Sequence, residues 1–101
     1  MTPAQFDVFI HATHRPKNAV DGGFLVCRMH GGIVPRAPFH ATGPSGEVLM
    51  RRLPGRVVLG LLVRGWIRPG PEIEIDGAKW TKLVPTQRGM LAMMTVGTGA
   101  A

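Results

Sequence analysis

The chain has few of the residues that build disulfides, catalytic triads or membrane spans. Its one cysteine, Cys27, cannot form an internal disulfide and suits a reducing cytoplasm. Ser45 is the only serine, and no two of the six carboxylates have a spacing that suggests acid–base catalysis. No run approaches the roughly eighteen apolar residues of a membrane span, and no basic and then apolar leader begins the chain. We therefore expect a cytoplasmic protein that is not an enzyme and has no membrane partner.

The chain length and the abundant residue types predict one small domain with many turns. The chain has 101 residues, of which 45% are hydrophobic, and its 14 glycines and nine prolines argue against a helical bundle. We expect a single domain over residues 1–96 and a frayed tail over 97–101.

The net charge of +6 is unevenly distributed. Residues 45–70 contain five arginines and one glutamate, whereas residues 71–101 have no net charge. This clustering fits a polyanionic partner, although a solvated basic face explains it too.

Three helices and a hairpin are predicted, which makes the fold class α+β. Thr2, Pro3 and Gln5 form a capping-box start for a helix at about 3–14, and Thr86 caps one at about 86–94. Residues 23–30 read as a strand, and residues 15–22 and 31–46 read as loops. Asp76-Gly77 predicts the turn of a hairpin at about 72–84.

The middle helix, at about 54–65, has the most informative pattern. Val57, Val58, Leu61 and Leu62 form one apolar stripe, which leaves Arg56 and Arg64 to face solvent or a partner. Gly65 stands where a left-handed residue ends a helix. The preceding segment, 47–53, reads slightly better as a strand paired with 24–30 than as the first helix of a helix-turn-helix pair.

Three segments resemble the winged helix-turn-helix family. Thr2-Pro-Ala-Gln-Phe is similar to the start of its first helix, and residues 55–67, with Arg64-Gly65-Trp66-Ile67 at their end, are similar to its recognition helix. Residues 80–91, from Trp80-Thr-Lys-Leu to Arg88-Gly-Met-Leu91, are similar to the last wing strand and the turn after it. The resemblance implies a small winged-helix domain that regulates transcription by binding double-stranded DNA, with a helix in the major groove.

The resemblance also implies which residues contact DNA. Arg56 and Arg64 belong to the recognition helix, and Lys79 and Lys82 of the wing touch phosphates. With the neighbouring arginines of the charge cluster, the expected DNA-binding residues are Arg51, Arg52, Arg56, Arg64, Arg68, Lys79 and Lys82.

An alternative function is a winged-helix module, an adaptor or inhibitor, that binds protein and not DNA. Glu72, Glu74 and Asp76 make the hairpin partly acidic, which would repel phosphates. Met90, Met93 and Met94 can either line a homodimer surface or pack on the first helix.

No cofactor or metal is expected. His11, His14, Cys27 and His30 have spacings similar to zinc ligands, but Cys27 and His30 would point to opposite faces of a strand. A packed thiol and a histidine at a helix end explain these residues better. The glycine pairs lack the lysine and hydroxyl of a phosphate loop and read as turns.

Overall fold

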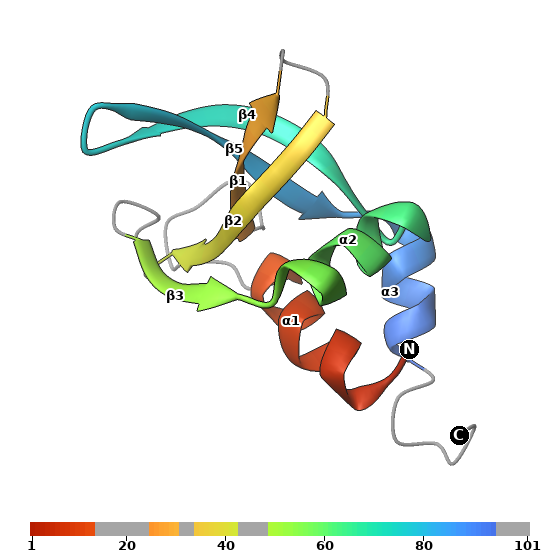
Figure 1. Ribbon diagram of the computed structural model, residues 1–101. Coiled ribbons are helices and arrows are strands. Elements are labelled where there is room, and N and C mark those ends of the chain that lie inside the picture. Colours follow the sequence, from red (N-terminus) through yellow and green to blue (C-terminus); the bar gives the residue numbers. More distant parts are fainter. Residues whose placement is uncertain (14–24, 31–33, 43–48, 95–101) are drawn as a thin grey trace.

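The protein is a small α+β domain in which three helices lie beside one antiparallel sheet (Figure 1). The structure, a computed structural model, describes residues 1–13, 25–30, 34–42 and 49–94. The elements in chain order are α1 (Pro3–Thr13), β1 (Leu25–His30), β2 (Val34–Thr42), β3 (Leu49–Leu53), α2 (Gly55–Val63), β4 (Ile67–Ile75), β5 (Ala78–Pro85) and α3 (Gln87–Met93). The five strands are ordered β3-β2-β1-β5-β4. The predicted loop 15–22 and the tail 97–101 lie outside the described residues.

Helix α1 begins at the predicted capping box. The backbone N–H of Thr2 donates to Gln5 Oε1 at 2.8 Å, and the N–H of Gln5 donates back to Thr2 Oγ1 at 3.1 Å. These two bonds satisfy donors that a helix start otherwise leaves unpaired. The prediction of a helix at about 3–14 is confirmed over Pro3–Thr13.

Helix α2 forms as its apolar stripe predicts. Val58 and Leu61 are buried, and Arg56 faces solvent. Gly65 follows with a φ of 71°, and its N–H donates to the carbonyl of Leu62 at 3.0 Å. A left-handed residue is needed here because the chain turns back at once into β4.

Strand β2 corrects the sequence analysis, which assigned residues 31–46 to a loop. Residues 34–42 form a strand despite Pro35 and Pro38, which weaken strand propensity. Two neighbouring strands, β1 and β3, stabilise β2 by pairing with it. Segment 49–53 is a strand as expected, but it pairs with β2 and not with residues 24–30.

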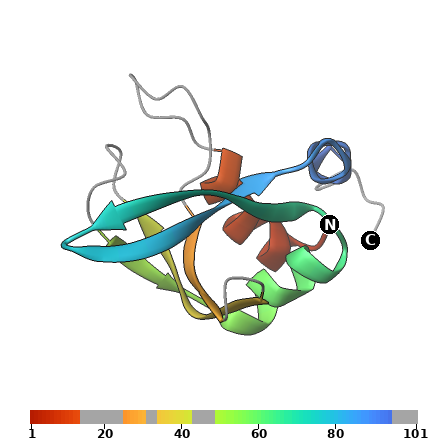
Figure 2. The same cartoon turned by 90° about the horizontal axis from the view of Figure 1, so that it is seen from above.

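The β4–β5 hairpin is longer than the predicted 72–84, since β4 begins at Ile67. Asp76 and Gly77 form its turn with φ values of 51° and 79°, the positive pair that a tight hairpin needs. Figure 2 shows the hairpin reaching away from α2 and α3, with its tip far from them.

The main core lies between the helices and one face of the sheet. Phe9 of α1 and Leu61 of α2 pack with side chains from four strands: Phe39 and Ala41, Leu53, Ile67, and Leu83. A smaller cluster forms on the hairpin around Ile75 and Trp80. The two clusters lie on opposite faces because side chains alternate along a strand, so Trp80 points away from the face that holds Leu83.

The predicted absence of membrane spans can be compared with the helices of the structure. Among the described residues, no helix is both long and apolar enough to cross a membrane.

Candidate nucleic-acid interface

Every strand places at least one basic side chain on the face of the sheet opposite the helices. Residues next to a buried core residue in a strand must point to the other face. His40 lies between buried Phe39 and Ala41, Arg52 precedes buried Leu53, and Arg68 follows buried Ile67. We call this surface the basic sheet face, and its members are Arg28 of β1, Arg36 and His40 of β2, Arg52 of β3, Arg68 of β4 and Lys82 of β5.

The strand register arranges five of these residues in two rows across the sheet, whereas Arg68, the partner of Val84, lies outside both rows. In the first row Lys82, Val26, His40 and Arg52 are successive backbone partners on four strands. At roughly 4.8 Å between neighbouring strands, Lys82 and Arg52 stand about 14 Å apart. In the second row Arg28 pairs with Arg36, and the register of β1 against β5 brings Trp80 to the other side of Arg28.

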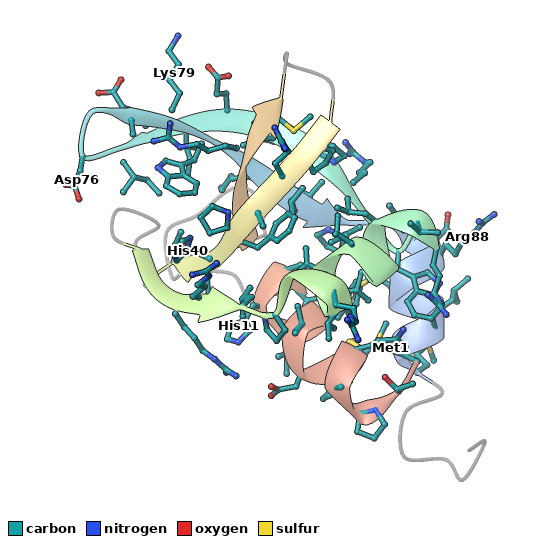
Figure 3. The ribbon with its side chains drawn as sticks, in the orientation of Figure 1. Met1, His11, His40, Asp76, Lys79 and Arg88 are labelled. Carbon is teal, nitrogen blue, oxygen red and sulfur yellow. The ribbon has the colours of Figure 1, made fainter. Side chains whose placement is uncertain are left out.

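Trp80 of β5 contacts two members of the basic sheet face. The guanidinium carbon of Arg28 is 5.1 Å from the indole centroid. The His40 ring meets the indole edge-on, with centroids 5.5 Å apart and planes at 86° (Figure 3). Trp80 is only 7% exposed, so Arg28 and His40, rather than the indole, form the surface here.

His40 is the one histidine among the named members of the basic sheet face. Its pKa is lowered, first because burial disfavours the charged imidazolium and second because Arg52 repels it. Among the described residues, His40 Nδ1 and Thr42 Oγ1 are buried side-chain atoms without a hydrogen-bond partner. Such atoms are uncommon in folded proteins.

The carboxylates of the described residues lie elsewhere. Asp7 is on α1, and Asp76 is at the tip of the hairpin in Figure 3. Glu72 pairs with Thr81 and Glu74 with Lys79, which places both on the opposite face to Trp80. Within the described residues, the basic sheet face therefore carries no carboxylate.

The seven predicted DNA-binding residues do not form one surface. Arg52, Arg68 and Lys82 belong to the basic sheet face. Arg51 points to the helix side of β3, where its guanidinium is 3.6 Å from Asp7. Lys79 lies 3.9 Å from Glu72 on the hairpin. Arg56 and Arg64 are exposed on or next to α2, as predicted.

The end of α2 shows why Arg64 differs from Arg56. The Arg64 guanidinium lies 5.5 Å from the Trp66 ring, and its Nη1 donates to the carbonyl of Gly60 at 3.4 Å. Arg64 therefore folds back on its own helix, whereas Arg56 remains exposed in the first turn.

Sequence reasoning missed three members of the basic sheet face. Arg36 and His40 were missed because residues 31–46 were assigned to a loop, and Arg28, between Cys27 and His30, was not singled out. The sequence does contain a pattern that indicates a strand with one basic face. In it, Arg36, Pro38 and His40 alternate with the apolar residues Phe39 and Ala41.

The described side chains include only His11 of the four residues in the zinc pattern. They contain no group of three His, Cys, Asp or Glu residues that could hold a metal. His14 lies outside the described residues, as do the side chains of Cys27 and His30.

Comparison with known proteins gives no relative from which a function could be transferred. No family model, curated protein or solved structure matches this chain.

Proposed function

We propose that this protein is a non-enzymatic nucleic-acid-binding protein that holds phosphates on its basic sheet face. The observation that carries the proposal is the separation of charge: all five strands contribute a basic side chain to one face, and none of the carboxylates in the described part of the chain shares it. Phosphate contacts supply most of the affinity of such proteins and depend little on sequence.

A narrower form of the proposal is a winged-helix regulator. In it, α2 enters the major groove of DNA, and the β4–β5 hairpin is the wing. The exposure of Arg56 supports this form. The basic sheet face has more support, because Arg64 is bonded to its own helix and Lys79 is next to Glu72.

The neighbouring residues Arg51 and Arg52 provide a matched test. They have the same charge and adjacent positions, but they point to opposite faces of β3. We expect Arg52→Ala to weaken binding to a fluorescein-labelled oligonucleotide about tenfold, the loss of one charge-assisted contact. Arg51→Ala is the control and should leave affinity within about twofold, because its exposed ion pair contributes little.

Fluorescence anisotropy at low salt measures both variants and Arg56→Ala. A large effect of Arg56→Ala with none of Arg52→Ala would favour the recognition-helix form. Equal effects of Arg51→Ala and Arg52→Ala would contradict the assignment of the contact to one sheet face. No binding of either single-stranded or duplex oligonucleotide would refute the proposal as a whole.

A second candidate function is protein docking through the helices. Val63 of α2 is 85% exposed, and Leu91 and Met94 at α3 are 60% and 70% exposed. Exposed large apolar side chains are a common feature of protein-interaction sites. In this form, the partner would be another protein, a second copy of the chain included, and not DNA.

Sedimentation equilibrium tests whether the protein partner is a second copy of this chain. A dimer that Leu91→Glu dissociates would support docking through α3. A monomer over the whole concentration range would remove the second copy as the partner. Nucleic-acid binding by that monomer would leave the basic sheet face as the functional surface.

A further inference from the structure

The width of the basic sheet face restricts which nucleic acid it can contact. Five strands at roughly 4.8 Å spacing make a surface about 19 Å across. The major groove of B-DNA is only about 12 Å wide and admits a helix or a two-stranded ribbon. The face can therefore touch the outside of a duplex, but its central residues cannot reach the base edges.

A single strand has no such restriction, because its bases are not stacked inside a duplex. Laid across the sheet, it can place phosphates along the first row, from Lys82 to Arg52, while its bases turn toward the second row. Proteins that hold single strands combine a basic path for the backbone with flat side chains on which bases stack.

Arg28 provides a flat group in the second row. Its guanidinium lies over the buried indole of Trp80, and Arg28 itself is exposed. The indole therefore supports the guanidinium from below and leaves the side chain accessible from above. Bases stack on guanidinium planes as they do on aromatic rings.

His40 adds a second group beside the same indole. Its ring contacts Trp80 edge-on, and its Nδ1 has no hydrogen-bond partner among the described residues. Arg28 and His40 come from different strands and meet at one tryptophan, so a base over Arg28 would lie near both.

From this arrangement we infer that the partner is single-stranded nucleic acid, with Arg28 as the stacking platform and Arg52, Arg68 and Lys82 as phosphate contacts. The inference rests on the proposed function and specifies its ligand. It assigns Arg28 a role that depends on its planar shape, whereas Arg68 needs only its charge.

Substitution by lysine separates the two roles, since lysine keeps the charge and loses the plane. The probes are a labelled oligothymidylate, a duplex of the same length, and an oligomer of abasic sites that has phosphates without bases. We expect oligothymidylate to bind at least about tenfold more tightly than the abasic oligomer, from the typical contribution of base stacking. We expect Arg28→Lys to weaken oligothymidylate binding by a similar factor and to leave abasic binding unchanged.

Arg68→Lys is the matched control and should bind all three probes like the wild type. Equal binding of oligothymidylate and the abasic oligomer would overturn the stacking role of Arg28. Binding to the duplex as tight as to oligothymidylate would overturn the single-strand inference and leave the proposed function standing. Binding to none of the probes would refute the proposed function as well.

Discussion

Among single residues, His40 makes the stability of the protein depend on pH. Burial, and then the charge of Arg52, holds its pKa below the ordinary value, and Arg28 contacts the same indole from the neighbouring strand. In the unfolded chain the imidazole titrates near 6.5. As the pH falls through that value, the unfolded chain takes up a proton that folded His40 does not, so His40 costs stability in acid.

The expected result is a difference between the wild type and His40→Gln. At pH 8 neither the wild type nor His40→Gln carries a charge at position 40. The difference between their free energies of unfolding at this pH is the reference for the measurement at pH 5. At pH 5 the wild type should have lost stability relative to His40→Gln. Urea unfolding at the two pH values measures this, and a pH-independent difference would contradict the lowered pKa.

Substitution by alanine should have opposite effects on the free energy of unfolding at Gly89 and at Gly60. A Cβ on Gly89 would collide with the carbonyl of Trp66 and stand 2.8 Å from the Phe9 ring. Gly89→Ala should therefore lower the free energy of unfolding by about 1–3 kcal/mol. On Gly60, inside α2, the nearest atom to a Cβ is Arg64 Nη1 at 3.6 Å.

Gly60→Ala should stabilise the protein by up to about 1 kcal/mol, because alanine loses less backbone entropy in a helix. Thermal unfolding of the two variants checks both signs. A stabilising Gly89→Ala would mean that α3 does not pack on α1 and Trp66 as described.

At the scale of elements, one threonine fixes α3 to the rest of the molecule. Thr86 Oγ1 accepts the N–H of Gly89 at 3.1 Å and donates to the carbonyl of Gly65 at 2.6 Å. The side chain thus caps α3 and ties it to the end of α2.

Thr86→Val removes both bonds and keeps the shape of the side chain. We expect a loss of about 1–2 kcal/mol in the free energy of unfolding. Thr13→Val is the control: its hydroxyl donates to the carbonyl of Ile10 in an exposed position, so its loss should cost much less. Urea unfolding compares the two variants, and equal costs would argue against the cap.

Local patterns were sufficient to predict most elements but not the sheet. The caps at Thr2 and Thr86, the Gly65 stop and the Asp76-Gly77 turn act over a few residues, so the sequence displays them directly. Strand β2 depends on partners distant in the chain, and its prolines disguised it.

At the scale of the whole molecule, the sheet order determines the candidate site. The sequence located the charge at residues 45–70, and that much could be predicted. The sequence alone could not show that Arg51 and Arg52 point to opposite faces of the sheet, because those faces depend on the pairing of β3 with β2. Nor could the sequence predict that Arg28, His40 and Trp80 lie close together, since their three strands meet only in the folded sheet.

The charge on one face of the sheet has a direct consequence for the effect of salt on binding. Each phosphate contact to a single strand releases counterions and contributes a slope of about −0.7 to log K against log salt. Arg52→Ala with Arg68→Ala removes two cations from the basic sheet face. Arg51→Ala with Lys79→Ala removes the same charge from the opposite face.

This slope, measured with oligothymidylate for the wild type and both double variants, tests directly whether the basic sheet face binds phosphates. We expect the slope of the Arg52 and Arg68 double variant to move toward zero by about 1.4, and that of the Arg51 and Lys79 double variant to equal the wild-type value. Equal slopes for the two double variants, or wild-type binding that does not change with salt, would contradict a phosphate-binding sheet face.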